Sequence, residues 1–281
     1  MMCATIQNSR VVVNDFKRNG CYFAGNDVDC SENSGRAGLP VKLLIIRHAD
    51  PDYENDCLTE RGENEARLLA DYLRKVPIDA AYVSPLARAR LTAEPVLQAK
   101  GMTAQIQDWL REFDASIVKP DKDAPGIVWD WLPQDWTAVG DFYSPDTWTR
   151  PSVIRDSDTQ EKYRAVCDGL DALLESHGYR RDGRLYRAER PNHDTIALFC
   201  HFGVESVLLS HLLSVSPMPL WHGFCAAPSS MTLVYTEERR EGVASFRVSE
   251  YGALYHLRQA DVAPSFSARF CERFSDDTRH D

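Results

Sequence analysis

Two apolar segments about 150 residues apart each end in a histidine. Residues 43–46 are followed by Arg47-His48, and residues 196–200 are followed by His201. In an open α/β sheet, ligands bind just beyond the carboxyl ends of the strands. If the two segments are neighbouring parallel strands, both histidines meet in one pocket, and Arg47 makes that pocket attractive to anions.

The residue types at this predicted pocket are suited to phosphate chemistry. A neutral imidazole is a competent nucleophile toward phosphorus, and a guanidinium offers planar, bidentate donors to phosphate oxygens. Arg88 lies in the segment 84–90, which follows the second predicted strand at the start of a helix, where free N–H groups attract anions. An isolated Arg-His pair is more often structural than chemical, but Arg88 and the second histidine favour a shared anion site.

Hydrophobic periodicity predicts the elements that position these residues. The first half of the chain reads as alternating strands and helices, which implies parallel pairing with right-handed crossovers. The expected elements are a strand at 41–46, a helix at 59–76 capped by Thr59 and ended by Pro77, a strand at 79–83, a helix at 86–101 interrupted near Pro95, and a strand at 103–107.

The second half of the chain predicts further elements of both kinds. They are a helix at 159–177, a solvated arginine-rich loop at 180–190, a strand at 195–200, a helix at 204–213, and closing strands at 231–235, 245–249 and 253–257. Gly242 fits a hairpin turn between the first two closing strands, so part of the sheet is expected to be antiparallel. The expected fold class is α/β, a three-layer α/β/α arrangement around a mostly parallel sheet.

Residues 108–156 interrupt this pattern with several prolines and no long helix. They hold most of the tryptophans of the chain, namely Trp109, Trp129, Trp131, Trp136 and Trp148. A loop-rich insertion of this length is usually a lid or a binding loop, so we expect one domain at 39–281 with a cap inserted at about 108–156. The alternative is that the tryptophans only pack the insertion onto the domain. Residues 1–38 show no sustained period and are expected to be a disordered extension.

The composition bounds the class of protein. Among 281 residues, 43% are hydrophobic and 26% are charged, which is typical of a soluble globular protein. The formal net charge of −10 disfavours a nucleic-acid partner, and no apolar run approaches the ~18 residues that a membrane span needs. Eight cysteines without metal-like spacing are typical of reduced thiols, so we expect a cytoplasmic protein. The oligomeric state is left open, a homodimer included.

Five motifs, in the correct order over roughly residues 41–257, resemble those of the histidine phosphatase superfamily (phosphoglycerate mutase-like), in particular its compact bacterial phosphatase branch. Arg47-His48-Ala49 stands where that family has Arg-His-Gly, and residues 58–62 match its Leu-Thr-x-x-Gly helix start. Residues 84–93 match Ser-x-Leu-x-Arg-Ala-x-x-Thr-Ala. Residues 110–113 resemble the Leu-Arg-Glu stretch that carries the proton donor, and residues 201–204 resemble the second Ser-His-Gly motif.

The resemblance implies a phosphoglycerate mutase-like fold and a metal-independent phosphatase that hydrolyses a phosphomonoester through a phosphohistidine. It implies that His48 is the nucleophile, that Arg47, Arg88 and His201 bind the phosphoryl group, and that Glu112 is the proton donor that later activates water. Such a site needs no cofactor and no metal, since cationic side chains neutralise the phosphate. The implied substrate is a small phosphorylated metabolite.

The sequence departs from the family pattern on both sides of the expected site. Ala49 replaces the glycine after the nucleophile, and Asp50-Pro51-Asp52-Tyr53 replaces the usual threonine and asparagine. After Glu112 the Gly-x-Trp-Glu-Gly stretch is missing, so Asp114 remains a second candidate for proton donor. These departures leave part of the phosphate site and the choice of substrate open.

Two alternative functions remain. A phosphoglycerate mutase is less favoured because its Leu-Asn-Glu-Arg-His-Tyr-Gly stretch is absent near Leu110. A non-catalytic module that binds a phosphorylated ligand or a partner is disfavoured because such a module needs no proton donor.

Two further side chains are candidates for the pocket: Arg111, which either binds substrate or is solvated, and His222, which precedes the closing strands.

Overall fold

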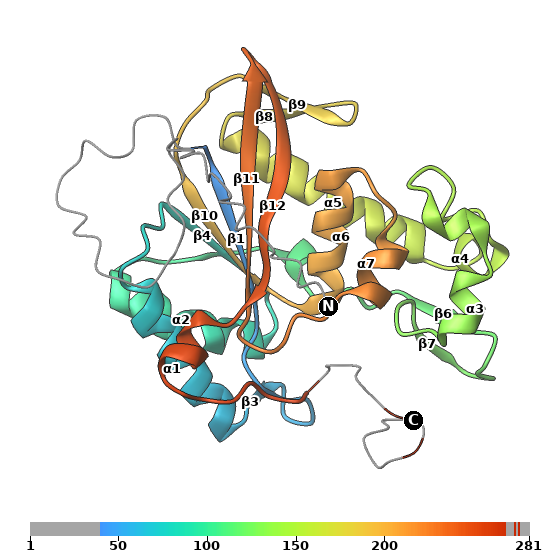
Figure 1. Ribbon diagram of the computed structural model, residues 1–281, viewed down its shortest axis with the longest axis horizontal. Coiled ribbons are helices and arrows are strands. Elements are labelled where there is room, and N and C mark those ends of the chain that lie inside the picture. Colours follow the sequence, from blue (N-terminus) through green and yellow to red (C-terminus); the bar gives the residue numbers. More distant parts are fainter. Residues whose placement is uncertain (1–39, 268–272, 274, 276–281) are drawn as a thin grey trace, which may run out of the picture. The chain divides into compact units, whose positions relative to one another are not determined.

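A mixed sheet of eight strands forms the centre of the fold (Figure 1). The computed structural model describes residues 40–267, 273 and 275, so the extension expected at residues 1–38 lies outside the described residues. The strand order across the sheet is β5-β4-β10-β1-β11-β12-β9-β8. The strands are β1 (Lys42–Arg47), β4 (Ala80–Val83), β5 (Gln105–Ile106), β8 (Tyr179–Asp182), β9 (Leu185–Ala188), β10 (Thr195–Cys200), β11 (Met231–Arg240) and β12 (Val243–Ala253).

The four strands β5, β4, β10 and β1 run parallel, as the alternation of strands and helices predicts. β1 and β10 are almost wholly buried, which explains why they read as continuous apolar runs. They pair in a register that places Arg47 opposite Cys200. The residues that follow them, His48 and His201, therefore leave the sheet side by side.

The other half of the sheet is antiparallel, so the expectation of a mostly parallel sheet holds only for those four strands. The segment at 180–190, where the composition predicts a solvated loop, forms the edge hairpin of β8 and β9. Its buried Tyr179, Tyr186 and Ala188 alternate with the exposed Arg180 and Arg187. This period of two marks a strand, but the high charge of the segment conceals it.

Helices cover both faces of the sheet, which confirms the predicted α/β/α layers (Figure 1). Alternate side chains of β1 divide the core, because Leu44 and Ile46 pack with α1 and α2 whereas Leu43 and Ile45 pack with α5 and α6. These helices are α1 (Glu60–Leu73), α2 (Ala87–Lys100), α5 (Thr159–Ser176) and α6 (Phe202–Leu213), which α7 (Pro217–Gly223) follows. Within the described residues, no helix has the length and apolar character that crossing a bilayer requires.

The start of α1 confirms the predicted cap at Thr59, but α1 ends at Leu73, before Pro77, and the predicted break in α2 is wrong. The side chain of Thr59 accepts the N–H of Gly62 at 3.1 Å and so begins α1, and Gly101 ends α2 with a φ of 62°. The interruption expected near Pro95 does not occur, and α2 continues through it. The helix tolerates this proline because the turns around it are packed into the core by Ala89, Ala93 and Val96.

The end of the sheet differs from the prediction in one element. β11 and β12 form an antiparallel hairpin around Gly242, which has a φ of 74°, as predicted. The third closing strand expected at 253–257 is wrong, because the chain forms the short helix α8 (Tyr255–Gln259) there. His256 and Leu257 are both buried, and two consecutive buried residues do not fit a strand with one solvent face.

The insertion at residues 108–156 contains only short elements. They are η1 (Asp108–Leu110), β6 (Ser116–Val118), β7 (Pro125–Ile127), α3 (Pro133–Thr137), η2 (Gly140–Tyr143) and α4 (Ser152–Arg155). The ring of Trp148 contacts Tyr163 on α5 and Trp221 on α7, and Trp136 stacks on His222. These contacts agree with the interpretation that the tryptophans pack the insertion onto the helices. That the insertion caps the pocket stays a prediction.

Candidate active site

The two histidines at the strand ends lie in contact. His48 follows β1 and His201 follows β10, and the centroids of their rings are 5.0 Å apart. Both side chains are buried. The parallel pairing of β1 with β10 therefore brings together two residues that lie about 150 positions apart in the chain.

The ring of His48 has one nitrogen occupied by the backbone. Its Nδ1–H donates to the carbonyl oxygen of Ala49 at 2.8 Å, since a carbonyl can only accept. Burial lowers the pKa of His48 well below its ordinary value, and the charges of Arg47 and Arg88 lower it further. The imidazole is therefore neutral near pH 7, and its lone pair is on Nε2.

Ala49, which stands where the family has glycine, is accommodated by packing. Its side chain is buried in a small apolar cluster with Leu58 and Ala66. Its N–H donates to Thr92 Oγ1 at 2.9 Å, and the Thr92 hydroxyl donates to the carbonyl of Arg88 at 2.7 Å. The backbone after the histidine is thus tied to α2, the helix that carries Arg88.

Arg47 and Arg88 are each anchored by a hydrogen bond from Nη1. The Nη1 of Arg47 donates to the carbonyl of Ala226, and the Nη1 of Arg88 donates to Asp56 Oδ1 at 2.6 Å. The Nε of each arginine is buried and has no hydrogen-bond partner within the described residues. Each guanidinium therefore keeps a donor for an anion in addition to the one that anchors it.

His201 is oriented by the residue that follows β4. Its Nε2 lies 2.7 Å from Ser84 Oγ, which also accepts the N–H of Leu86 at 3.3 Å. The hydroxyl can donate its proton to Nε2, and in that tautomer the ring proton is on Nδ1. Burial, and then the charge of His48, lowers the pKa of His201 well below its ordinary value. His201 Nδ1 is buried and unpartnered in the part of the chain that the structure describes.

The carboxyl group of Glu112 lies against the first turn of α6. Its Oε1 accepts the N–H of Phe113 at 2.8 Å and the N–H of Val204 at 3.1 Å. Burial raises its pKa, while these hydrogen bonds and the charges of Arg47 and Arg88 act against that rise. Glu112 therefore keeps its proton to a higher pH than an ordinary glutamate.

Asp114, the second candidate for proton donor, points away from this site. Its side chain is 70% exposed, and its Oδ1 forms an ion pair of 2.8 Å with Lys162 on α5. The structure places Glu112, rather than Asp114, against the start of the helix that follows His201.

The two remaining candidates differ in their position. Both ring nitrogens of His222 bind backbone groups, because Nδ1 donates to the Met218 carbonyl at 2.7 Å and Nε2 accepts the N–H of Trp131 at 3.1 Å. Burial lowers the pKa of His222 to about 4, so this residue is a neutral structural histidine. Arg111 is exposed, and its charge contributes to the lowered pKa of His201.

Two residues at the site have no role in the sequence-based prediction. Ser84 directly follows β4, so the strand-end rule that selects the histidines also selects it. Asp56 binds Arg88 from the turn between β2 (Pro51–Asp52) and β3 (Cys57–Leu58). Its contact depends on a backbone φ of 46° that no sequence signal announces.

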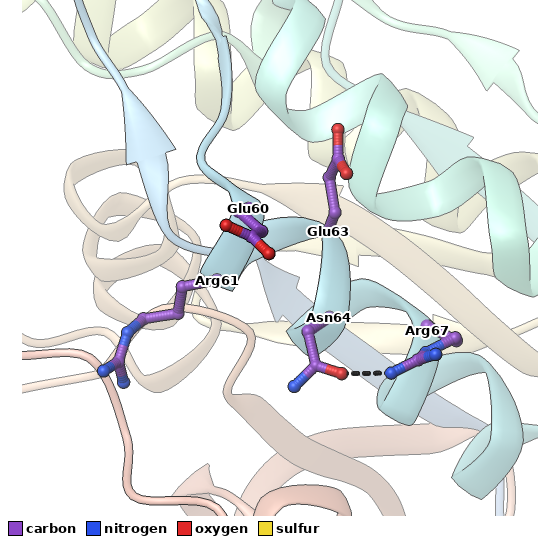
Figure 2. Close-up of a pocket in the computed structure, with 5 residues that line it drawn as sticks. All are labelled: Glu60, Arg61, Glu63, Asn64 and Arg67. Carbon is purple, nitrogen blue, oxygen red and sulfur yellow. Dashed lines mark hydrogen bonds between the residues drawn. The ribbon is translucent and has the colours of Figure 1, made fainter.

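A separate surface hollow is lined by residues of α1 (Figure 2). It is lined by Glu60, Arg61, Glu63, Asn64 and Arg67. These side chains point outward from one helix, and none belongs to the predicted site. Among the described residues, no three His, Cys, Asp or Glu side chains lie together in a way that could hold a metal ion.

Known proteins resemble this chain in sequence. The family model of the histidine phosphatase superfamily (branch 1) matches residues 43–248. Phosphoserine phosphatase 1 of Hydrogenobacter thermophilus is 35% identical over 222 residues, which cover 74% of this chain and 93% of that protein. The adenosylcobalamin/alpha-ribazole phosphatase of Salmonella typhimurium is 24% identical over 199 residues, which cover 65% of this chain and 84% of that protein.

A solved structure shares the fold. The mycobacterial glucosyl-3-phosphoglycerate phosphatase aligns with a TM-score of 0.51 at 18% identity, over 75% of this chain and 98% of that one. The family match and the 35% identical relative confirm the predicted class of enzyme, a hydrolase of phosphoric monoesters. The chain belongs to the histidine phosphatase superfamily, branch 1.

Proposed function

We propose that the protein is a metal-independent phosphatase that hydrolyses the phosphomonoester of a small metabolite through a phosphohistidine on His48. One observation carries the proposal. The neutral, buried His48 shares its site with three buried nitrogens that lack partners within the described residues: Arg47 Nε, Arg88 Nε and His201 Nδ1. A buried nucleophile beside side chains with unpaired donors suits the transfer of an anionic phosphoryl group.

In the first half-reaction, His48 Nε2 attacks the phosphorus atom and the ester P–O bond breaks. The hydrogen bond from Nδ1 to the Ala49 carbonyl holds the ring while Nε2 forms the P–N bond, and it stabilises the positive charge that the ring acquires. The leaving alkoxide takes the proton of Glu112, whose pKa burial raises.

The phosphoryl oxygens are bound by the three unpaired donors. Arg47 and Arg88 supply full positive charges, and the neutral His201 supplies one N–H. Because the site is buried, these donors act in a medium of low dielectric constant and need no reorganisation during the reaction.

In the second half-reaction, Glu112 is ionised after it gives up its proton. Its carboxylate accepts a proton from a water molecule, which attacks the phosphorus atom and breaks the P–N bond. His48 is released as a neutral imidazole and the product is inorganic phosphate. Asp114 does not take this role, because its carboxylate is paired with Lys162 at the surface.

The class of substrate is proposed from the relatives. The similar proteins named above include a phosphoserine phosphatase and a glucosyl-3-phosphoglycerate phosphatase, both named for small phosphorylated metabolites. The net charge of −10 supports a partner other than nucleic acid, and the scattered cysteines support a place in the cytoplasm. The insertion at 108–156, which carries Glu112 and Trp129, is proposed to form the wall that faces the leaving group.

Hydrolysis of p-nitrophenyl phosphate by the wild-type protein and by a His48→Ala variant tests the proposal. We expect phosphate release by the wild type, its loss in the variant, and an acid-labile, alkali-stable phosphoenzyme trapped by a rapid denaturing quench at alkaline pH from a substrate labelled in its phosphoryl group. An absence of turnover between about pH 4 and pH 9 contradicts the proposal. Isomerisation of a phosphorylated metabolite without release of phosphate would instead identify a mutase.

A further inference from the structure

The turn that joins β2 to β3 closes on the guanidinium of Arg88. Asp56 Oδ1 lies 2.6 Å from Arg88 Nη1, and the ring centroid of Tyr53 lies 5.5 Å from Arg88 Cζ. The side chain of Arg88 is only 11% exposed, whereas that of Asp56 is 44% exposed. One turn thus provides both an ion pair and a ring contact to an arginine of the site.

Asp56 is held in an unusual conformation by this arrangement. Its φ of 46° lies in the left-handed region, which residues with a Cβ seldom adopt and which Asp and Asn tolerate best. Its second carboxylate oxygen, Oδ2, accepts the N–H of Ala87, the first residue of α2, at 3.1 Å. The carboxylate therefore binds both the backbone at the start of α2 and the side chain of the next residue, Arg88.

A comparison of Arg88 with Arg47 identifies the donor of Arg88 that the ion pair with Asp56 leaves free. Arg47 is also bound through Nη1, here by the carbonyl of Ala226, and the ring of Phe202 lies 5.8 Å from its Cζ. Both arginines leave Nε buried and without a hydrogen-bond partner among the residues described. The two differ in the charge of the anchor, since a carbonyl holds Arg47 and a carboxylate holds Arg88.

The alternative is that Asp56 competes with phosphate for Arg88. The geometry disfavours it, because the carboxylate takes Nη1 alone while the edge that includes Nε remains unpaired. The other oxygen of Asp56 is engaged by Ala87, so the carboxylate does not turn toward Nε. An acceptor that fixes one end of a guanidinium restricts the direction in which its other donors point.

We propose that Asp56 is a positioning residue that anchors Arg88 for binding of the phosphoryl group and, through its negative charge, limits how tightly the site retains inorganic phosphate. The inference rests on the proposed function, because it assigns Arg88 to the phosphoryl group. The inference assigns two distinct effects to Asp56. Its oxygen accepts a hydrogen bond that sets the geometry of Arg88, and its negative charge sets the affinity of the site for the anion.

Two substitutions separate these contributions. Asp56→Asn keeps one side-chain acceptor for Nη1 and tolerates the left-handed φ, but it lacks the charge and the second oxygen that accepts the N–H of Ala87. Asp56→Ala lacks both the acceptor and the charge. We expect Asp56→Ala to lower kcat/KM about tenfold or more and to weaken inhibition by inorganic phosphate. We expect Asp56→Asn to restore kcat/KM to within about threefold of wild type and to tighten that inhibition about threefold or more.

The matched control is Asn55→Ala in the same turn, because the side chain of Asn55 binds Asp52 and has no contact with Arg88 in the structure. It is expected to leave kcat/KM and phosphate inhibition at the wild-type values. Unchanged kinetics in Asp56→Ala, a higher kcat/KM in that variant, or an Asp56→Asn variant no better than Asp56→Ala would each overturn the proposal. If thermal unfolding shows that Asp56→Ala does not fold, the proposal is tested by comparing the inhibition constant for inorganic phosphate of Asp56→Asn with that of the wild type. An Asp56→Asn variant that phosphate inhibits no more tightly than the wild type would then overturn the proposal.

If the proposed function is wrong, the wild-type protein itself will show no turnover, which distinguishes that failure from failure of the inference about Asp56. In that case calorimetric titration of inorganic phosphate into the wild type and the two Asp56 variants still tests the anchoring of Arg88. Weaker binding by Asp56→Ala and tighter binding by Asp56→Asn support the inference. Equal binding by all three proteins contradicts it.

Discussion

Gly203 and Glu112 lie so close that an added Cβ on Gly203 would be 2.7 Å from the carboxylate Oε1. The same Cβ would be 2.7 Å from the indole Nε1 of Trp129. The first turn of α6 thus reserves space for the carboxyl group that we assign to proton transfer. Any side chain at this position must displace that carboxyl group or the tryptophan.

Gly203→Ala is expected to lower kcat for an alkyl phosphomonoester about tenfold or more, because a misplaced acid protonates the leaving alkoxide poorly. Steady-state kinetics of the purified variant measure the effect. Gly140→Ala is the matched control, since a Cβ there meets no atom within 4 Å. A Gly203→Ala variant with wild-type kcat would show that Glu112 is not confined as described.

Glu112→Gln is expected to affect substrates according to their leaving groups. An alkoxide needs protonation and p-nitrophenolate does not, so kcat/KM for an alkyl ester should fall by about 10²–10⁴ while that for p-nitrophenyl phosphate falls much less. The two substrates are compared on the same enzyme preparation. Asp114→Asn serves as the control and should leave both rates unchanged, because Asp114 is paired with Lys162 at the surface. An equal loss on both substrates would argue against proton donation by Glu112.

The pH dependence of kcat/KM for an alkyl ester follows from two opposite shifts. The pKa of His48 is held well below its ordinary 6.5 by burial and then by Arg47, so the nucleophile stays neutral into the acidic range. The pKa of Glu112 is raised from 4.5 by burial, so the acid is lost only as the pH rises through that higher value. We expect a maximum on the acidic side, with an alkaline limb that Glu112→Gln removes. Persistence of that limb in the variant would assign it to another group.

Glu65 links stability to pH through a buried carboxyl group in α1. Its Oε2 accepts the N–H of Asp50 at 2.9 Å, and burial raises its pKa from 4.5 to about 7. The folded protein binds this proton more tightly than the unfolded chain, so the stability it contributes is complete below pH 4.5 and is lost as the pH rises through about 7. Glu65→Gln should therefore gain about 3 kcal/mol over wild type between roughly pH 4 and pH 8.

Urea unfolding of both proteins at the two pH values measures this difference. Other groups that titrate in this range, Glu205 among them, are common to both proteins and cancel in the comparison. A difference in the free energy of unfolding that does not change with pH would show that folding does not raise the pKa of Glu65.

The buried elements were readable from the sequence because burial on both faces leaves a plain pattern. β1 and β10 read as continuous apolar runs, and α1 reads as a helix because its buried Ala66, Leu69 and Leu73 recur at helical spacing. The edge hairpin at 179–188 was not readable, since only one side chain in two is buried there and arginines fill the remaining positions.

Some residues of the candidate site were predictable from the sequence and others were not. The motifs place His48, Arg88 and His201 at strand and helix ends, where topology alone brings them together. Asp56 was not predictable, because its contact with Arg88 needs a left-handed φ in a four-residue turn. Glu112 was predicted by resemblance only, and its position depends on the glycine in α6 that leaves room for it.

The pairing of β4, β10 and β1 also has a consequence for how the chain folds. Ser84 and His201 share a hydrogen bond although they are 117 positions apart in the chain. The strands β1, β4 and β10 each contribute different residues to the contacts between them, so no single helix or strand contains both partners of such a contact. Loops of this length must close before such contacts stabilise the chain, and contacts of large sequence separation slow folding. The candidate site therefore assembles only after the chain has been synthesised through β10, and earlier portions of the chain contain its parts without its activity.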